Sequence, residues 1–312
     1  MRTNSFSAWI LAVRPYSLGN SVILVCVASA LAFADGGFHA LPAFLSLLFA
    51  VTMQCTANLV NDLCDFRKGA DQPDRLGPDR AFAKGFITER AMKRGIAAFT
   101  LAACLIGCGL LAWAFHAGIL YYGGWELVAV GAACILFAYL YTAGPWPLAY
   151  HGLGDVAVVL FFGVVPVTLT YYLQTGAWSV ESFIASLACG LVIDTMLMIN
   201  NFRDREEDVR CNKRTVVVCF GARFGSWSYL GLGLGAVALN LSLLFCGRPF
   251  AALLPFLYLG AHIATWRKMV RIDRGEALNV CLGETARNIL LFGFLLIGGI
   301  LLDILVGDTL VR

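Results

Sequence analysis

Nine long apolar stretches restrict this chain more than any other feature. Each is long enough to cross the roughly 30 Å hydrocarbon layer of a bilayer as a helix of about 20 residues. They cover approximately 17–34, 41–64, 90–115, 122–143, 153–174, 179–201, 222–246, 249–270 and 285–307. Transmembrane β-strands are shorter and alternate in polarity, whereas these stretches are continuously apolar. We therefore predict an all-α integral membrane protein with about nine transmembrane helices.

The composition agrees with a chain that lies in a bilayer. Hydrophobic residues make up 59% of the sequence and charged residues only 14%, which is too little polar surface for a soluble globule. No low-complexity linker divides the apolar stretches. We predict a single membrane domain, residues 1–312, in contact with membrane lipids.

Lys and Arg residues are distributed unevenly between the two sides of these helices. Of the 23, 21 lie in the N-terminal segment, in the connections that follow the even-numbered apolar stretches, or at the helix ends beside these connections. The two exceptions are Arg248 and Arg312. Short loops rich in Lys and Arg stay in the cytoplasm, so we predict a cytoplasmic N-terminus and, after nine crossings, a C-terminus outside. Because the basic residues serve topology first, they do not indicate a nucleic acid partner.

Two long polar connections, at about 66–89 and 202–221, each follow a helix that ends in acids and amides. The first helix ends in NLVNDLCD at 58–65, and the second carries NNFRDREED at 200–208. Both connections are cytoplasmic by the charge pattern and lie four spans apart. We therefore predict that the two helix ends face each other across a shared cavity.

The acids and amides of these two helix ends are spaced to form one face of each helix. Side chains three and four residues apart are neighbours on a helix, as are Asn58, Asp62 and Asp65 in the first block and Asn200, Asp204 and Asp208 in the second. Asn61 and Asn201 lie beside them, and Asp71 follows in the loop. Several carboxylates near the end of a membrane helix are costly unless a cation compensates them, and hard oxygen ligands select Mg²⁺.

A simpler alternative is that these acids have no ligand-binding role. They would then be polar residues at the helix ends that form ion pairs with the neighbouring Arg67, Lys68, Arg203 and Arg205. The recurrence of the pattern, with amides as well as acids, favours the metal site instead.

Basic residues follow both acidic blocks. They are Arg75, Arg80 and Lys84 after the first block and Lys213 and Arg214 after the second, while Arg14 opens the first helix. Lys and Arg side chains and Mg²⁺ together neutralise a diphosphate and stabilise the charge that develops on it as a leaving group. We therefore predict a site for a magnesium-bound diphosphate.

Four segments of the sequence resemble a known family. NDLCDFRKGAD at 61–71 and NNFRDREEDVRCNKRT at 200–215 resemble the two aspartate-rich signatures of the UbiA superfamily of intramembrane prenyltransferases. YTAGPWPLAYHGLGD at 141–155 and NKRTVVV at 212–218 are similar to the members that prenylate 1,4-dihydroxy-2-naphthoate in menaquinone biosynthesis. Where the superfamily places the last acid of its first signature, this chain has Gly69, and only Asp71 is available.

The resemblance implies a fold, a location and a set of site residues. The fold is nine helices around a lipid-open central cavity, in the cytoplasmic (inner) membrane of a bacterium. The implied ligands of Mg²⁺ are Asn58, Asp62, Asp65, Asp71, Asp204 and Asp208. The expected catalytic residues are Asp62, Asp65, Asp204, Asp208 and Lys213. The expected substrate-binding residues are Arg14, Asn58, Asn61, Arg80, Lys84, Tyr141, Tyr150, Asn200, Asn201 and Arg214.

The implied reaction is an electrophilic aromatic substitution. A polyprenyl diphosphate ionises with loss of diphosphate, and the allylic cation is attacked by the carbon of 1,4-dihydroxy-2-naphthoate that bears the carboxylate. Carbon dioxide then leaves, and the product is demethylmenaquinol. Aromatic rings can stabilise such a cation, and candidates are Phe161, Phe162, Tyr139, Tyr171 and Tyr172.

A second polar group, Tyr150, His151 and Asp155, lies between the fourth and fifth predicted helices on the cytoplasmic side. It could orient a hydroxyl or carboxylate of the aromatic acceptor, with His151 as a candidate base. Asp194, within the sixth helix, is a further intramembrane acid, and such acids are often functional.

Two other functions stay open at this point. The same metal site could serve a different aromatic acceptor, such as 4-hydroxybenzoate or homogentisate. A cation-coupled transporter would instead place its acids near the bilayer midplane, whereas here they gather at the cytoplasmic helix ends and basic residues follow them.

Overall fold

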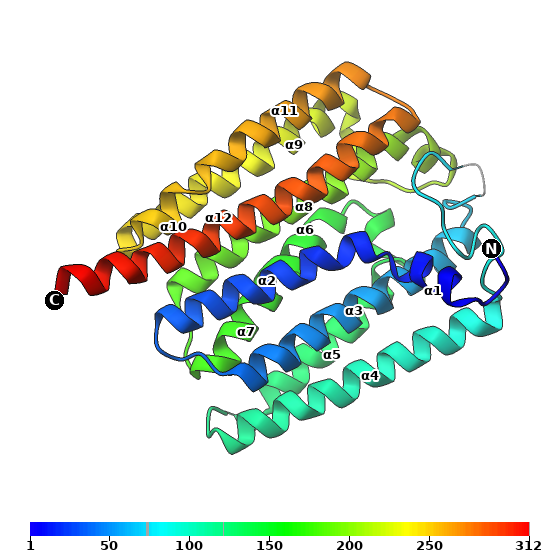
Figure 1. Ribbon diagram of the computed structural model, residues 1–312. Coiled ribbons are helices and arrows are strands. Elements are labelled where there is room, and N and C mark those ends of the chain that lie inside the picture. Colours follow the sequence, from blue (N-terminus) through cyan, green and yellow to red (C-terminus); the bar gives the residue numbers. More distant parts are fainter. Residues whose placement is uncertain (73–74, 121, 312) are drawn as a thin grey trace.

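Helices account for most of the chain in the computed structural model, which describes residues 1–72, 75–120 and 122–311. Within these ranges there is no β-strand, and one isolated bridge joins His151 to Arg214. The predicted all-α fold is confirmed. The helices, in chain order (Figure 1), are α1 (Phe6–Val13), α2 (Pro15–Ala34), α3 (Ala40–Arg67), α4 (Glu89–His116), α5 (Trp125–Leu140), η1 (Leu148–Tyr150), α6 (Gly154–Val159), η2 (Leu160–Val164), α7 (Val165–Thr175), α8 (Val180–Arg210), α9 (Val216–Asn240), η3 (Leu241–Cys246), α10 (Pro249–Leu253), α11 (Phe256–Ile272), η4 (Glu276–Leu278) and α12 (Asn279–Val311).

Eight of these helices or continuous helix pairs are long and apolar enough to cross a membrane, counted over the described ranges. They match all the predicted spans except the fourth. There α5 has 16 residues, which at 1.5 Å per residue is about 24 Å and less than the hydrocarbon thickness. Nine full-length spans are therefore not confirmed, because the fourth is a shorter apolar helix.

The N-terminus and the C-terminal helix end lie at opposite ends of the bundle (Figure 1). The connection from α3 to α4 and the connection from α8 to α9 both lie at the end that holds the N-terminus (Figure 1). The two acidic blocks are thus brought to one end of the molecule. Which side of the membrane this end faces stays a prediction from the charge distribution.

Helix α8 is the most enclosed of the spanning helices and α4 the least. In their most apolar windows, 72% of the residues of α8 are buried inside the protein but only 17% of those of α4. Helix α4 runs along one edge of the bundle (Figure 1). The second acidic block therefore extends from the helix that the rest of the fold packs around.

The span opposite α8 is interrupted by the π-helical segment η2 between α6 and α7. Gly163 in this segment approaches α8 so closely that a Cβ atom on it would lie 2.4 Å from the Cα of Gly190. Small residues permit such close contact between membrane helices, and π-helical bulges often occur beside functional sites. Phe161 and Phe162, on the same segment, line the large apolar cavity described below.

An ion cluster at the far end of the bundle accounts for the unusual position of Arg248. Its guanidinium bonds to Asp35 at 2.7 Å and to Glu181 at 3.0 Å, and the hydroxyl of Tyr171 donates to Asp35 at 2.6 Å. The cluster links the end of α2, the start of α8 and the turn before α10. Arg248 is therefore a structural link, while Arg312, the other exception in the charge pattern, lies outside the described residues.

Replacement of Arg248 by Ala should lower the stability of the protein by about 1–3 kcal/mol, since it leaves two partly buried carboxylates without their partner. Thermal unfolding in detergent measures this as a lower melting temperature. Arg274→Ala is the matched control, because Arg274 is 72% exposed although it also contacts acids. Equal melting temperatures for the two variants would contradict the structural role of Arg248.

Candidate active site

The last turns of α3 carry the first acidic block. Asp62 is fully buried; its Oδ2 accepts a hydrogen bond from the backbone N–H of Phe82 at 3.3 Å, and its Oδ1 has no partner among the described residues. Asp65 accepts the hydroxyl of Tyr150 at 2.9 Å. The side-chain oxygen of Asn61 accepts the hydroxyl of Thr142 at 2.8 Å.

The last turns of α8 carry the second block. Asp204 accepts two hydrogen bonds from the guanidinium of Arg203, at 2.6 and 2.7 Å. Asp208 is buried and pairs through Oδ1 with the ammonium of Lys213 at 3.3 Å, while its Oδ2 has no partner in the described part of the chain. Asn200 and Asn201 lie one to two turns earlier on α8 and line the polar cavity that is described below.

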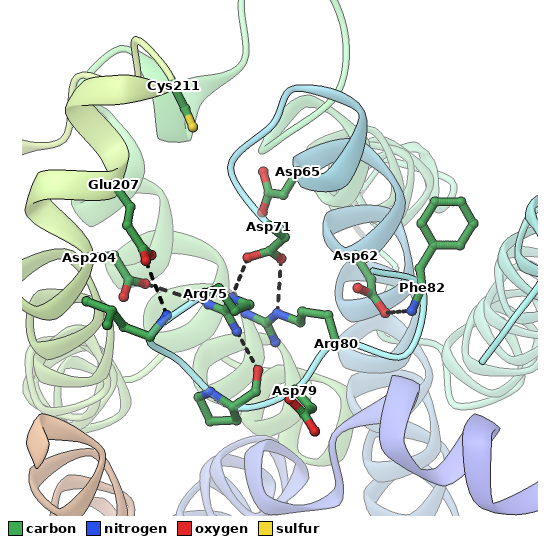
Figure 2. A network of polar contacts seen from close by, with 12 residues as sticks. Asp62, Asp65, Asp71, Arg75, Asp79, Arg80, Phe82, Asp204, Glu207 and Cys211 are labelled. Atoms are coloured by element: carbon green, nitrogen blue, oxygen red, sulfur yellow. Dashed lines mark hydrogen bonds and ion pairs between the residues drawn. The ribbon is translucent and has the colours of Figure 1, made fainter. Parts of the chain in front are cut away.

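The loop after α3 brings Asp71 into the space between the two blocks (Figure 2). Asp71 is 4% exposed and pairs with Arg75 at 2.7 Å and Arg80 at 3.0 Å. Arg75 also reaches Asp204 on α8 at 3.7 Å. Burial alone would raise the pKa of Asp71, but Arg80 and Arg75 lower it overall, so this carboxylate is held in its charged form. Arg75 thus joins the loop to the second block.

A polar cavity of about 140 Å³ lies between the two blocks, and Asp62 is not among the residues that line it. Its acids are Asp65, Asp71, Asp155, Asp204 and Asp208, and its basic residues are Arg14, Arg75, Arg80 and Lys213. The cavity therefore carries many charges of both signs in a small volume, with one more acid than base. It can hold a compact polyanion if further positive charge accompanies it.

A second, mostly apolar cavity of about 530 Å³ extends from the polar one into the bundle. It is lined largely by side chains of α2 to α8 and by η2. Six residues line both cavities: Arg14, Asn61, Arg80, Tyr141, Leu197 and Asn200. A long apolar chain with a charged head group can thus place its head in the polar cavity and its chain in the apolar one.

Arg14 is placed by a sharp break between α1 and α2. It has the left-handed conformation (φ 56°), and its guanidinium bonds to the side-chain oxygen of Asn58 at 3.5 Å and the backbone oxygen of Asn58 at 3.3 Å. Burial lowers the pKa of Arg14 to about 10. The side-chain NH₂ of Asn58 donates to Val13 and Ser17 across the break, at 2.9 and 3.1 Å. Asn58 therefore fixes the position of Arg14, and its role as a metal ligand stays a prediction.

Lys213 lines the polar cavity and lies beside Tyr150, which does not line it. The ammonium of Lys213 lies 5.7 Å from the ring centre of Tyr150, and that of Lys68 lies 4.5 Å from it. Burial raises the pKa of the Tyr150 phenol, and the nearby Asp65 raises it further. Burial would lower the pKa of Lys213, but Asp208 and Asp65 raise it. Both groups are therefore protonated hydrogen-bond donors at neutral pH.

Besides Tyr150, two predicted substrate-binding residues, Lys84 and Arg214, line neither cavity. Lys84 is exposed and pairs with Asp79 at 3.2 Å. Arg214 is exposed and contributes its backbone N–H, which donates to the carbonyl oxygen of Tyr150 at 3.1 Å. The sequence placed them near the site because they follow the acidic blocks, but the chain turns their side chains outward.

Of the predicted aromatic residues, Phe161 and Phe162 line the apolar cavity. The hydroxyl of Tyr139 is bonded to Thr100 at 2.8 Å, Tyr171 belongs to the far ion cluster, and Tyr172 is fully buried against Trp178. The sequence could not separate these rings, because all five lie in apolar helices.

The carboxylate oxygens of the two acidic blocks are the type of ligand that Mg²⁺ prefers. Asp62 Oδ1 and Asp208 Oδ2 are buried carboxylate oxygens without a hydrogen-bond partner among the described residues, an arrangement that a cation would compensate. Within the same ranges, however, no three acid, His or Cys side chains are grouped closely enough to hold an ion alone. Mg²⁺ is commonly held by one or two carboxylates together with substrate phosphates. The site therefore fits a metal that binds along with a phosphate-containing ligand.

Sequence comparison identifies known proteins that this chain resembles. The profile of the UbiA prenyltransferase family matches residues 22–302. The 1,4-dihydroxy-2-naphthoate octaprenyltransferase of Escherichia coli is 34% identical over 95% of this chain and 96% of its own length. The protein of the same name from Mycobacterium tuberculosis is 34% identical over 73% of this chain and 75% of its own length.

Solved structures give the same fold. A UbiA homologue from Archaeoglobus fulgidus bound to DMAPP and Mg²⁺ superimposes with a TM-score of 0.60 at 14% identity, over 93% of this chain and 99% of that one. A UbiA homologue from Aeropyrum pernix superimposes with a TM-score of 0.65 at 16% identity, over 91% and 97% of the two chains.

The position of Arg75 depends on a clamp that the sequence did not predict. The backbone N–H of Leu76 donates to Glu207 on α8 at 3.2 Å, and its carbonyl oxygen accepts the side-chain NH₂ of Asn279 on α12 at 2.8 Å. Asn279 in turn accepts a hydrogen bond from Arg203 at 3.0 Å. No sequence signal relates Asn279 to a loop about 200 residues earlier, because only the packing of α12 beside α8 brings them together.

Replacement of Asn279 by Ala should loosen this loop. One lost hydrogen bond is worth about 0.5–1.5 kcal/mol, so amide hydrogen exchange in the segment 75–83 should rise roughly two- to tenfold. Asn288→Ala is the control, because Asn288 lies on the same helix and bonds to Thr265 instead. Unchanged exchange in Asn279→Ala, or an equal rise in both variants, would show that the clamp does not hold the loop.

Proposed function

The chain belongs to the UbiA prenyltransferase family, and from this membership we propose that it transfers a polyprenyl group from polyprenyl diphosphate to 1,4-dihydroxy-2-naphthoate. The products would be demethylmenaquinol, carbon dioxide and diphosphate. The acceptor is proposed from the activity for which relatives matching most of this chain are named. The observation that supports the chemistry best is the junction between a charged cavity and a long apolar one.

The polar cavity suits the diphosphate. Arg14, Arg80 and Lys213 line it from three different parts of the chain, and Arg75 adds a guanidinium between the two acidic blocks. These cations can bind the phosphate oxygens and stabilise the charge that builds up as the carbon–oxygen bond breaks. Magnesium, when bound by Asp62, Asp65, Asp204 and Asp208 together with the phosphates, would neutralise the remaining charge.

The apolar cavity suits the prenyl chain and its cation. Phe137, Phe161 and Phe162 line it, and the rings of Phe137 and Phe161 are stacked with centres 3.7 Å apart. Aromatic faces stabilise a nearby cation by roughly 0.5–2 kcal/mol each. The apolar lining also keeps water away from the reactive cation, so that the aromatic acceptor captures it instead.

The orientation and location follow from the same proposal. The charged end of the bundle would face the cytoplasm, as the positively charged connections indicate, and the membrane would be the bacterial inner membrane. The aromatic acid could then enter the site, and the released diphosphate could leave it, on the side where both dissolve.

The purified protein should form prenylated product from a polyprenyl diphosphate and 1,4-dihydroxy-2-naphthoate labelled in its carboxylate, and should release the label as carbon dioxide. The reaction should require Mg²⁺ and stop on addition of a chelator. Product from 4-hydroxybenzoate but not from the naphthoate would keep the site chemistry and reject the proposed acceptor. No product from either acceptor would contradict the proposal as a whole.

Asp62→Asn and Asp208→Asn should each reduce the turnover number roughly 100-fold or more, because each removes a carboxylate that would hold the Mg²⁺ needed to stabilise the departing diphosphate. Asp273→Asn is the control, since Asp273 lies at the same end of the bundle but is 46% exposed and pairs with Arg205. Folded Asp62 and Asp208 variants that kept more than half of the activity would overturn the two acidic blocks as the reacting site.

A further inference from the structure

Asp155 stands apart from the other acids of the polar cavity. It lies in the first turn of α6 and lines the cavity, and its Oδ1 atom is buried with no hydrogen-bond partner among the described residues. Buried polar atoms in folded proteins are almost always hydrogen-bonded. Asp155 therefore borders the cavity with a carboxylate whose hydrogen bonds the described residues leave incomplete, and a ligand in the cavity can supply a donor to it.

Each of the remaining acids of the cavity already has at least one donor, although Asp208 also keeps an unpartnered Oδ2 atom among the described residues. Each is bonded to an arginine, a lysine or a tyrosine hydroxyl of the protein, as is the case for Asp65, Asp71, Asp204 and Asp208. These four belong to the group that the diphosphate and its cations engage. Asp155 comes from a different helix and remains for the second substrate.

The neighbours of Asp155 in the sequence are excluded from this role. Tyr150 uses its hydroxyl to donate to Asp65 at 2.9 Å. His151 is exposed, bonds through Nδ1 to the carbonyl oxygen of Pro147 at 2.8 Å and stacks on Trp146. Of the polar group predicted between the fourth and fifth helices, only Asp155 lines the cavity.

Asp155 is also close to the point where the two cavities meet. Tyr141 lines both cavities, and its hydroxyl lies against the start of α6, 3.4 Å from the position that a Cβ atom on Gly154 would occupy. A phenolic hydroxyl of a substrate can donate one hydrogen bond and accept another. The carboxylate of Asp155 and the hydroxyl of Tyr141 offer one partner of each kind, beside the place where the prenyl carbon would be attacked.

We propose that Asp155 accepts the hydrogen bond of the 4-hydroxyl group of the aromatic acceptor and so orients its ring toward the prenyl carbon. This assignment rests on the proposed function. The 1-hydroxyl of 1,4-dihydroxy-2-naphthoate is adjacent to the substrate carboxylate and satisfied by it, so the 4-hydroxyl is the free donor. Because that hydroxyl is meta to the carbon that bears the carboxylate, the contribution of Asp155 is orientation of the ring.

Binding of two naphthoates under anaerobic conditions tests the assignment without any turnover. The probes are 1,4-dihydroxy-2-naphthoate and 1-hydroxy-2-naphthoate, which lacks only the 4-hydroxyl, and their fluorescence reports binding to the detergent-solubilised protein. A hydrogen bond to a charged group should make the wild-type protein bind the dihydroxy compound roughly 10- to 100-fold more tightly. In Asp155→Asn and Asp155→Leu this preference should fall to about threefold or less, with the affinity for 1-hydroxy-2-naphthoate unchanged.

Asp194→Asn is the matched control. Asp194 is 2% exposed and also has an unpartnered Oδ1 atom among the described residues, but it lines neither cavity. This variant should keep the wild-type preference. A preference that survives in both Asp155 variants, is lost equally in Asp194→Asn, or is absent from the wild-type protein overturns the assignment.

The outcome can be separated from that of the proposed function. If the wild-type protein binds the dihydroxynaphthoate in an Asp155-dependent way but prenylates only another phenol, the acceptor assignment fails and the role of Asp155 stands. If the protein prenylates the naphthoate and its preference ignores Asp155, the proposed function stands and the role of Asp155 is wrong.

Discussion

The arrangement of the site depends on the ion pairs that Arg75 forms with Asp71 and Asp204. These charges lie at the ends of membrane helices, where an unpaired carboxylate or guanidinium would be strongly destabilising. By pairing with Asp71 in the loop after α3 and with Asp204 near the end of α8, Arg75 holds this loop against the second acidic block and compensates both carboxylates. The same contact defines a small polar cavity in an otherwise apolar bundle.

The charge of this cavity explains why its ligand should bring metal ions with it. With five acids and four basic residues in its lining, the cavity is close to neutral. A diphosphate adds several negative charges, which the protein alone does not offset. Cations that enter with the diphosphate would take over the acids that arginine and lysine now contact, and would free these basic side chains to bind phosphate oxygens. One cavity can thus be stable both when empty and when it holds a charged ligand.

Much of this organisation could be predicted from the sequence. The apolar stretches predicted the all-α fold with many membrane-spanning helices, and the helical spacing placed Asp65, Asp204 and Asp208 where they line the polar cavity, although Asp62 does not line it. These predictions succeed because helix periodicity and membrane insertion are local properties of the chain. The short α5 was overestimated because apolar residues continue past the helix end into the following turn.

Other features depend on contacts between distant segments and could not be predicted. Lys84 and Arg214 follow the acidic blocks closely, yet loop geometry turns their side chains outward. Asn279 reaches Leu76 only because α12 packs beside α8. Asp155 differs from its neighbours because its Oδ1 atom has no hydrogen-bond partner among the described residues. For such residues the sequence gives the chemical type, and the tertiary structure decides which side chain faces the site.

The most direct test of this account is a structure of the protein with Mg²⁺ and a non-cleavable thiolo analogue of a polyprenyl diphosphate. The account predicts that the diphosphate lies between the ends of α3 and α8, with metal density beside Asp62 and Asp208, the prenyl chain in the apolar cavity, and Arg75 moved from Asp204 to a phosphate oxygen. A diphosphate bound elsewhere, with Arg75 still between Asp71 and Asp204, would contradict it.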